Sequence, residues 1–406
     1  MKYLIRTLVL TIALIALFSC EEDPIPNYVE GYESSDTSIY YWRQPFFADT
    51  IASFPCESYL VNDNLLFYST EFAYGDFALH SYSMQGIKNW TLDEGHLGTI
   101  NYADVYNTLL IKDQIVNSCY GEYYGIDVAS GKMLWAEARE LGNAYISAND
   151  EMGLIFIISG TADGKQIIEM KSTTESEFEQ VFIMQKKIGY GSGIPAVNSF
   201  LNSEGDTMLV FQVRRITGLV SQNKLDFYCF NVTKHEMAWS LEDLKDGDSN
   251  VSAPEIQGDY IYFLGKWTMY KIHKETGEIA WENEMYWDSQ GSNFVFSNDY
   301  VIFNLDNGDL VALNKSDGKL AWANEGLSGC CVDLNILNET IYMPNREMFI
   351  IDAKNGELLH KIRSPTRTEP TRGDASFLKL AAIDKDQTRI FVGDYYYMYC
   401  LKHPEL

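Results

Sequence analysis

The sequence contains little that would support nucleic-acid binding or metal chemistry. Basic residues are few: 31 Lys and Arg stand against 57 Asp and Glu, and the formal net charge of the 406 residues is −26. Such acidity makes nucleic acid and anionic lipid headgroups poor partners. The six cysteines that follow Cys20 lack the spacing of metal ligands, and no His-Glu-x-x-His or Gly-x-Ser-x-Gly motif occurs. Helix signals are nearly absent after the first twenty residues, which favours an all-β fold.

The first twenty residues have the features of a targeting segment. Lys2 and Arg6 provide a basic start, and the apolar run from Leu8 to Phe18 is too short for a comfortable transmembrane span. The segment ends in Leu17-Phe-Ser-Cys20, which resembles the signal of bacterial lipoproteins. In that family the cysteine is diacylated and becomes the first residue of the mature chain. The alternative is an ordinary secretory signal that contains a cysteine by chance.

The residues after Cys20 fit the lipoprotein interpretation. Glu21-Glu-Asp23 resembles the acidic tract that sends Bacteroidetes lipoproteins to the outer membrane, and residues 21–37 are rich in Glu, Asp, Pro and Ser, as flexible tethers are. We therefore expect a signal peptide at residues 1–19, a lipidated Cys20 and tether at residues 20–37, and a folded domain at residues 38–406. The expected location is the outer membrane, on its periplasmic or cell-surface face.

A short phrase recurs along the folded part at intervals of roughly forty residues. It is clearest at residues 124–135, which read Tyr-Gly-Ile-Asp-Val-Ala-Ser-Gly-Lys-Met-Leu-Trp. Alternation of apolar residues predicts two strands, and the Asp-x-x-x-Gly segment predicts the turn between them, because Asp bonds its own downstream backbone and Gly adopts positive φ. A repeat of this length is one supersecondary unit, which buries its apolar face only by stacking on its neighbours.

Most copies of the phrase end in a Trp on the outgoing strand. Trp is large enough to fill the wedge between adjacent sheets, so we expect these residues to anchor one unit to the next rather than to stack on a ligand. The predicted anchors are Trp42, Trp90, Trp135, Trp239, Trp281 and Trp322. His235, His273 and His360 occupy the Gly, Asp and Trp positions of their units, and we expect them to be structural substitutions.

A second pattern counts the units. A polar turn followed by a short apolar run occurs eight times, but the eighth unit reaches the C-terminus without its last strand. A spare strand with a Trp lies at residues 38–46 and would complete the eighth sheet, which removes an exposed strand edge. The predicted fold is an all-β, eight-bladed β-propeller whose last blade is closed by the N-terminal strand. Seven blades is the fallback if the degenerate third unit, near residues 151–185, is miscounted.

The phrase resembles the PQQ-like propeller repeat, Ala-x-Asp-x-x-Thr-Gly-x-x-x-Trp, over nearly all of residues 40–402. The resemblance is clear in four units and weaker in the others. In size and anchoring the chain is similar to the propeller lipoprotein of the outer-membrane β-barrel assembly machinery, a binding scaffold without chemistry of its own. Another branch of the family, the PQQ-dependent dehydrogenases, holds quinone and calcium on the propeller axis beneath a disulfide between adjacent cysteines.

Cys330 and Cys331 are the feature that favours the enzyme branch. A strand, however, simply places two such small apolar side chains on opposite faces. The dehydrogenases are also longer, and their cysteine pair comes early in the propeller rather than late. Asp333 could be a base and Asn335 a calcium ligand, but no motif places a matching Glu or Trp beside them. We therefore expect no cofactor, no metal and no enzymatic activity, with a PQQ- and calcium-dependent quinoprotein oxidoreductase as the alternative.

Two arginine-containing segments are the candidate partner contacts. Arg214 and Arg215 stand among aliphatic residues in the fourth unit, whereas Arg363, Arg367 and Arg372 lie in a long polar loop before the eighth. Loops on a rigid scaffold commonly carry recognition, and Arg is common at interface centres; solvated loops without a partner are the simpler alternative. We expect a protein-interaction scaffold whose partner is an outer-membrane or cell-surface protein. A glycan- or peptide-binding accessory lipoprotein is a further alternative.

Overall fold

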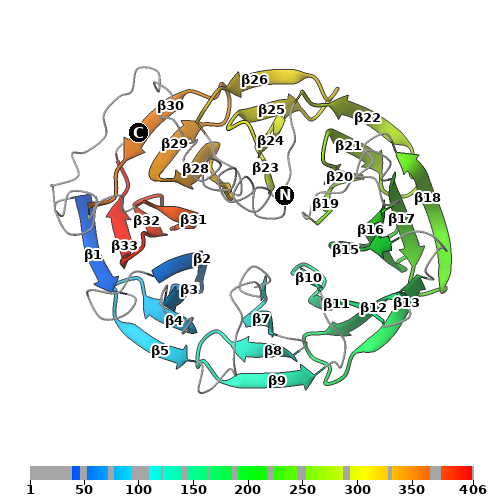
Figure 1. Cartoon of the computed structure of the whole chain (residues 1–406), viewed down its shortest axis with the longest axis horizontal. Coiled ribbons are helices and arrows are strands. Elements are labelled where there is room, and N and C mark those ends of the chain that lie inside the picture. The colour runs from blue at the N-terminus through cyan, green and yellow to red at the C-terminus, as the bar shows by residue number, and fades with distance from the viewer. Residues whose placement is uncertain are drawn as a thin grey trace, which may run out of the picture.

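The chain folds into a ring of eight antiparallel β-sheets in a computed structural model (Figure 1). The structure describes residues 39–45, 53–71, 77–93, 109–119, 122–138, 145–161, 164–184, 191–216, 224–244, 253–286, 293–327, 332–365 and 376–404. Within these ranges, no helix has the length and apolar character needed to cross a membrane. The predicted eight-bladed β-propeller is confirmed, and the fallback of seven blades is wrong.

Each blade is built from consecutive strands that run from the axis outwards. Blade 1 contains β2 (Ser53–Val61), β3 (Asn64–Glu71), β4 (Phe77–Ser83) and β5 (Lys88–Asp93); blade 2 contains β6 (Leu109–Ile111), β7 (Gln114–Cys119), β8 (Glu122–Asp127) and β9 (Met133–Ala138). Blade 3 contains β10 (Tyr145–Asn149), β11 (Leu154–Gly160), β12 (Gln166–Ser172) and β13 (Glu179–Met184). Blade 4 has five strands, β14 (Gly191–Gly193), β15 (Val197–Leu201), β16 (Thr207–Ile216), β17 (Lys224–Asn231) and β18 (Glu236–Leu244).

The second half of the ring follows the same plan. Blade 5 contains β19 (Glu255–Gln257), β20 (Tyr260–Leu264), β21 (Thr268–His273) and β22 (Ile279–Glu284); blade 6 contains β23 (Phe294–Phe296), β24 (Tyr300–Asn304), β25 (Leu310–Asn314) and β26 (Leu320–Asn324). Blade 7 contains β27 (Asn335–Leu337), β28 (Thr340–Asn345), β29 (Glu347–Asp352) and β30 (Leu358–Ile362). Blade 8 contains β31 (Leu378–Ile383), β32 (Arg389–Gly393), β33 (Tyr397–Lys402) and, outermost, β1 (Tyr40–Pro45).

The two ends of the described chain meet in blade 8. Strand β1 pairs antiparallel with β33, with Trp42 opposite Cys400 and Gln44 opposite Met398. Figure 1 shows this pair as the blue strand on the outer side of the red one. The N-terminal strand thus closes the ring, as the spare strand at residues 38–46 predicts, and β33 is left with no unpaired edge.

The apolar core lies between neighbouring blades. Successive side chains of a strand point to opposite faces of its sheet. Each blade therefore buries side chains against the blade before it and against the blade after it. Between blades 4 and 5, the rings of Phe227 and Phe263 stack with centroids 4.3 Å apart. Between blades 5 and 6, Tyr262 and Trp281 pack in one buried cluster with Phe303. Every junction therefore needs its two blades at once, which is why the repeats fold as a ring rather than singly.

The recurring Asp-x-x-x-Gly segment forms the turn that its residues predict. In blade 2 the backbone N–H of Gly131 donates to the carbonyl of Asp127 at 2.9 Å, and Gly131 has a φ of 69°. The carboxylate of Asp127 accepts from the backbone N–H of Ser130 at 2.7 Å. This is the side-chain-to-backbone bond expected of Asp at a turn, and a side chain at Gly131 would be strained.

Blades 3 and 4 depart from the repeat. The unit near residues 151–185 forms the complete blade 3, although the turn between β12 and β13 contains no Gly. In blade 4, His235 stands at the Gly position with a φ of 55°, a conformation that is uncommon for residues other than Gly. His273 keeps the turn of blade 5 through its backbone, because its carbonyl accepts from Gly277 at 2.9 Å.

Candidate functional site

A cavity of about 660 Å³ lies on the inner side of the ring, between blades 3, 4 and 5. Its walls come from residues 148–152 of blade 3, residues 198–201 of blade 4, and β19 with the turn that follows it in blade 5. Figure 1 shows β10, β15 and β19 next to one another around the axis. The volume is within the range of small-ligand sites in proteins.

Asparagine side chains fix the three inner strands to one another. Asn149 of β10 donates its amide to the side-chain oxygen of Asn198 at 3.0 Å and to the carbonyl of Ser199 at 2.6 Å. Asn198 of β15 in turn donates to the carbonyl of Pro254, next to β19, at 2.8 Å. The oxygen of Asn149 accepts from the backbone N–H of Met152 at 2.9 Å. These bonds hold the polar floor of the cavity in one geometry.

Three carboxylates line the cavity: Asp150 and Glu151 in the turn after β10, and Glu255 in β19. Asp150 also accepts from the backbone N–H of Lys112 in blade 2 at 2.5 Å. The Glu255 side chain is exposed to solvent, yet the surrounding strands displace part of its hydration. This desolvation raises the pKa of Glu255 to about 7. An added positive charge would therefore favour the ionised form of Glu255.

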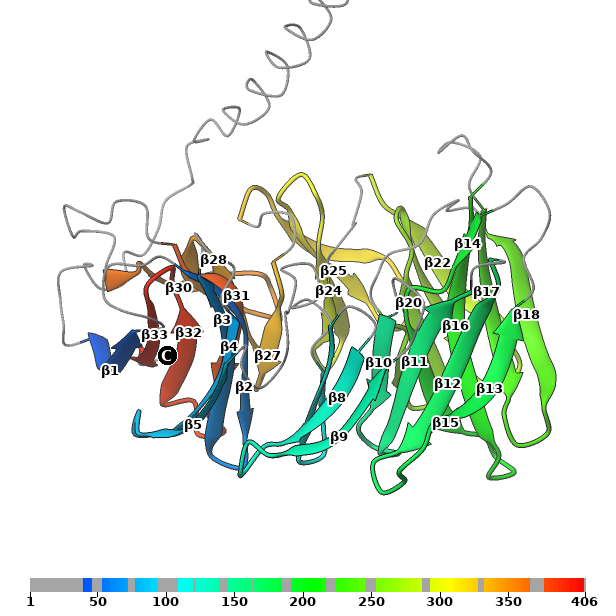
Figure 2. The same ribbon diagram turned by 60° about the horizontal axis from the view of Figure 1, so that its bottom comes forward.

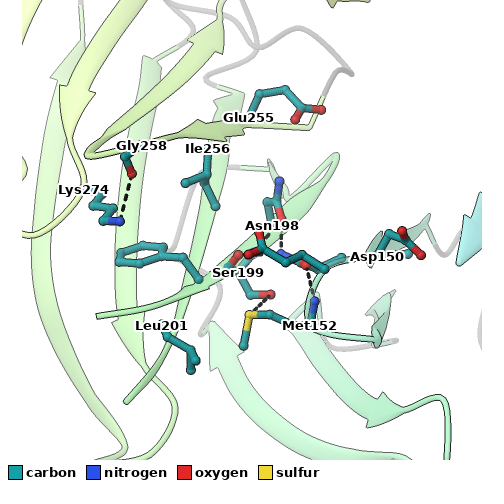
Figure 3. Close-up of a pocket in the computed structure, with 13 residues that line it drawn as sticks. Asp150, Met152, Asn198, Ser199, Leu201, Glu255, Ile256, Gly258 and Lys274 are labelled. Atoms are coloured by element: carbon teal, nitrogen blue, oxygen red, sulfur yellow. Dashed lines mark hydrogen bonds between the residues drawn. The ribbon is translucent and has the colours of Figure 1, made fainter. Parts of the chain in front are cut away.

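The one lysine of the lining, Lys274, is already engaged. Its ammonium group donates to the carbonyl of Gly258 at 2.8 Å and lies 4.0 Å from the carboxylate of Asp259. It also lies 5.7 Å from the ring centroid of Phe200. In Figure 3, Lys274 points toward Gly258, at the opposite end of the cavity from Asp150. Lys274 therefore lies away from the acidic end, where the ammonium group of Lys112 in blade 2 donates to the backbone carbonyl of Glu151 at 3.4 Å.

Apolar side chains form the remaining wall. Ile256 of β19 is half-buried, and Leu201 at the end of β15 is 54% exposed. Figure 3 shows Ile256 between Glu255 and Ser199, with Leu201 at the lower edge. The cavity therefore presents carboxylates, fixed amides and apolar groups side by side.

No motif in the sequence predicted this site. Most of its residues lie in the inner strands and the turns that follow them, where the sequence shows only the recurring polar turn and apolar run. A usable signal was present, because Asn149-Asp-Glu151 and Glu255 place three acidic residues in or beside the innermost strands of the third and fifth units. What could not be foreseen is that side chains from separate blades line one cavity.

Five of the six Trp residues singled out in the sequence lie over the turn Gly of the next blade. A Cβ added to that Gly would lie 2.6 or 2.7 Å from the nearest atom of the indole, and the indole N–H donates to a carbonyl of the same turn at 3.0–3.1 Å. The pairs are Trp42 with Gly86, Trp90 with Gly131, Trp239 with Gly277, Trp281 with Gly318, and Trp322 with Gly356.

Comparison with known proteins agrees with these repeats. A family model described as PQQ_2, outer membrane protein assembly factor BamB, matches residues 265–398. The chain is a β-propeller with PQQ-like repeats. No curated protein matches its sequence significantly.

Solved structures share the fold of this PQQ-like propeller at low sequence identity. Sqt1 of Saccharomyces cerevisiae is 10% identical with a TM-score of 0.62, and the alignment covers 89% of this chain and 98% of Sqt1. The computationally designed Ika8 protein is 12% identical with a TM-score of 0.58, over 87% and 96% of the two chains. BamB from Moraxella catarrhalis is 15% identical with a TM-score of 0.46, over 75% and 96%. At these identities the first two matches show the fold alone.

The sixth Trp of the PQQ-like propeller has a different environment. Trp135 lies over Gly125 of its own blade and donates its indole N–H to the side chain of Gln114 at 3.2 Å. The ammonium group of Lys171 in blade 3 lies 3.7 Å from the centroid of the Trp135 rings, and Phe178 meets these rings edge-on. A cation–π contact therefore replaces the Trp–Gly contact where the next turn has no Gly.

The two predicted arginine contacts of blade 4 lie on β16. Arg215 forms a two-pronged ion pair with the buried Asp226, with contacts of 2.6 and 2.7 Å, and also pairs with Asp243. These hydrogen bonds raise the pKa of Arg215 further above its ordinary value. Arg214 is half-buried, and the aliphatic residue before it, Val213, is buried. The segment thus holds blade 4 together.

Arg363 is the one arginine of the 363–372 loop that the structure describes. Its side chain is 52% exposed, and its Nε donates to Glu347 at 2.8 Å. The second oxygen of Glu347 pairs with the buried Lys361. Arg363 therefore takes part in a charge cluster that joins β29 to β30. The predicted contact residues Arg367 and Arg372 lie outside the described residues.

The predicted vicinal pair, Cys330 and Cys331, and the predicted lipidation site, Cys20, also lie outside the described residues. Asn335, considered as a calcium ligand, donates its amide to the carbonyl of Ala381 in blade 8 at 2.9 Å. In the described part of the chain, no three His, Cys, Asp or Glu side chains gather closely enough to hold a metal ion.

Proposed function

We propose that this PQQ-like propeller is a non-catalytic scaffold that binds another protein at the outer membrane, to which Cys20 anchors it. The proposal rests on the structural contacts that the repeat residues make. The Trp, Gly and Asp of the repeat are engaged in contacts within and between blades, so the repeat builds a rigid ring. A rigid ring with loops on its faces is suited to recognition.

The matched family model supports the same proposal, because its description names an outer membrane protein assembly factor. The lipoprotein-like sequence Leu17-Phe-Ser-Cys20 supports the anchor. Two acyl chains give stable membrane attachment, whereas one gives only marginal binding. The anchor would hold the ring at the membrane, and residues 20–37 would set its reach.

Membrane fractionation tests the anchor. The Cys20→Ala variant should move from the membrane pellet to the soluble fraction, while the matched Ser19→Ala variant should stay in the pellet. A Cys20→Ala protein that remains membrane-bound after a high-salt wash contradicts the anchor, because peripheral electrostatic attachment is removed by salt.

Mild crosslinking in intact cells tests the scaffold. Purification of the anchored full chain should recover a specific outer-membrane or cell-surface protein, and the soluble Cys20→Ala variant should recover less of it. A quinone chromophore in the purified protein, with quinone-dependent oxidation of an alcohol that is lost on changing Cys330 and Cys331 to Ser, would instead support the quinoprotein alternative.

A further inference from the structure

We propose that the cavity between blades 3, 4 and 5 binds a short peptide segment that presents an Arg or Lys beside an apolar residue. This inference rests on the proposed function and names the chemistry of one contact with the partner. The charge of the lining and its apolar side chains favour this occupant.

The charge of the cavity selects a cation. Asp150 and Glu151 of blade 3 and Glu255 of blade 5 line it, whereas Lys274 donates to the carbonyl of Gly258 and lies 4.0 Å from the carboxylate of Asp259. An anionic ligand would meet three carboxylates there. A guanidinium or ammonium group would meet carboxylate oxygens that favour charge-assisted hydrogen bonds.

The apolar wall selects what accompanies the cation. Leu201 is 54% exposed and Ile256 is half-buried, so an apolar side chain of the ligand can remove both from water. A glycan fits less well, because sugars commonly stack on an exposed aromatic face. Phe200 is the aromatic residue among the described lining residues, and it is 6% exposed.

The amide floor makes the site preorganised. Asn149 and Asn198 are fixed by bonds of 2.6–3.0 Å to their neighbours, so the strands that bear the carboxylates do not need to order on binding. Preorganisation reduces the entropy lost in association. The site joins three blades, which gives it a defined shape without any loop outside the described residues.

A fluorescence-anisotropy titration of the full chain tests the inference. The probe is fluorescein-labelled Gly-Ser-Leu-Arg-Leu-Ser-Gly, compared with versions in which Arg is Glu or both Leu are Ser. The parent probe should bind saturably, and each altered probe should bind at least about tenfold more weakly. A tenfold change corresponds to about 1.4 kcal/mol of binding free energy, which is the expected loss for one contact. Equal binding of the parent and Glu-containing probes would overturn the proposal.

Variants locate the binding. Glu255→Gln combined with Glu151→Gln should weaken the parent probe about tenfold or more, and Ile256→Ser should weaken it in the same direction. Glu236→Gln, at the exposed start of the outermost strand of blade 4, is the matched control and should leave binding unchanged. Equal melting temperatures exclude misfolding. Binding that survives the double substitution would overturn the site.

The pH dependence adds a second readout. Because desolvation raises the pKa of Glu255 to about 7, the parent protein should bind the Arg probe more tightly at pH 8 than at pH 6. Asp150 and Glu151 from the neighbouring turn and Lys274 from the turn after β21 are the other charged groups of the lining. Glu255→Gln should remove most of the difference. A difference that persists in this variant contradicts the role of Glu255.

Spermidine distinguishes a free cation from a peptide. It should compete with the probe only at much higher concentration, because it offers no apolar side chain to Ile256 and Leu201. Competition at equal concentration would overturn docking of a peptide segment. The tests of the anchor and the scaffold do not involve this cavity, so a failed titration with successful crosslinking removes only the present inference.

Discussion

Trp281 lies so close over Gly318 that a Cβ at Gly318 would stand 2.6 Å from two atoms of the indole. The indole N–H donates to the carbonyl of Lys315, in the same turn, at 3.1 Å. Gly318 also has a φ of 71°. Glycine is thus required at this position for two reasons: its own turn needs a positive φ, and the indole ring from the neighbouring blade leaves no room for a side chain.

Gly318→Ala is expected to destabilise the ring more than a positive φ alone explains. An Ala in this conformation costs about 1–2 kcal/mol, and overpacking against the indole adds roughly 1–3 kcal/mol. Gly205→Ala is the matched control, since Gly205 has a φ of 85° and nothing lies within 4 Å of an added Cβ. In urea denaturation, Gly318→Ala should lose more free energy of unfolding than Gly205→Ala. Equal losses would show that the indole moves aside without an energetic cost.

The repeat predicted the fold, but it did not predict which Trp packs on which Gly. Trp135 and Gly131 stand four residues apart in the clearest copy, yet Gly131 lies under Trp90 of the preceding blade. Trp135 itself packs on Gly125 and Lys171. Spacing within a unit cannot show this, because the contacts depend on how neighbouring blades stack. For the same reason, no local sequence pattern predicts the cavity, because residues from three blades line it.

Ring closure should depend on the N-terminal strand. Deleting residues 38–46 removes β1 and the contact of Trp42 with Gly86 and Met84, so blade 8 loses its outer strand and its junction with blade 1. Trp42→Ala alone should cost less than the roughly 3–5 kcal/mol of a fully buried large side chain, because Trp42 is half-buried. Deleting residues 21–28 should be neutral. Thermal melting distinguishes the three, and equal midpoints for both deletions would contradict closure by β1.

Arg363 should affect stability, because its side chain, at the end of β30, pairs with Glu347. Arg363→Glu would place a negative charge beside Glu347, whose other oxygen pairs with Lys361. Because the Arg363 side chain is half exposed, the expected loss is modest, about 1 kcal/mol. Arg363→Gln should lose less, since it removes the attraction without adding repulsion. A melting midpoint that is unchanged in Arg363→Glu would show that solvent screens this pair fully.

The partner contact predicted from the sequence is best tested without Arg363. Changing Arg367 and Arg372 to Glu should weaken capture of an acidic partner surface and reduce its dependence on salt, with stability nearly unchanged. Pull-down from membrane extract at low and high salt measures this. Capture that is unaffected at both salt concentrations would remove the loop from the interface.

His80 should make the protein sensitive to mild acid. The side chain is 4% exposed on β4, and its Nδ1 lies 3.2 Å from the hydroxyl of Thr91. Burial, with a smaller contribution from Lys88, lowers the pKa of His80 to about 3. Between this value and the ordinary pKa near 6.5, the unfolded chain binds the proton and the folded chain does not. The free energy of unfolding therefore falls as the pH falls through this range.

The protonation of His80 should lower the free energy of unfolding by about 2 kcal/mol between pH 7 and pH 5. Carboxylates add their own dependence, so the measurement is the difference between variants in urea denaturation at the two pH values. His80→Gln, which cannot titrate, should be less stable at pH 7 but should lose less on acidification than the parent. His235→Gln, in an exposed turn, is the matched control and should keep the parent's slope. If His80→Gln and the parent lose the same free energy between pH 7 and pH 5, His80 is not held neutral in the folded ring.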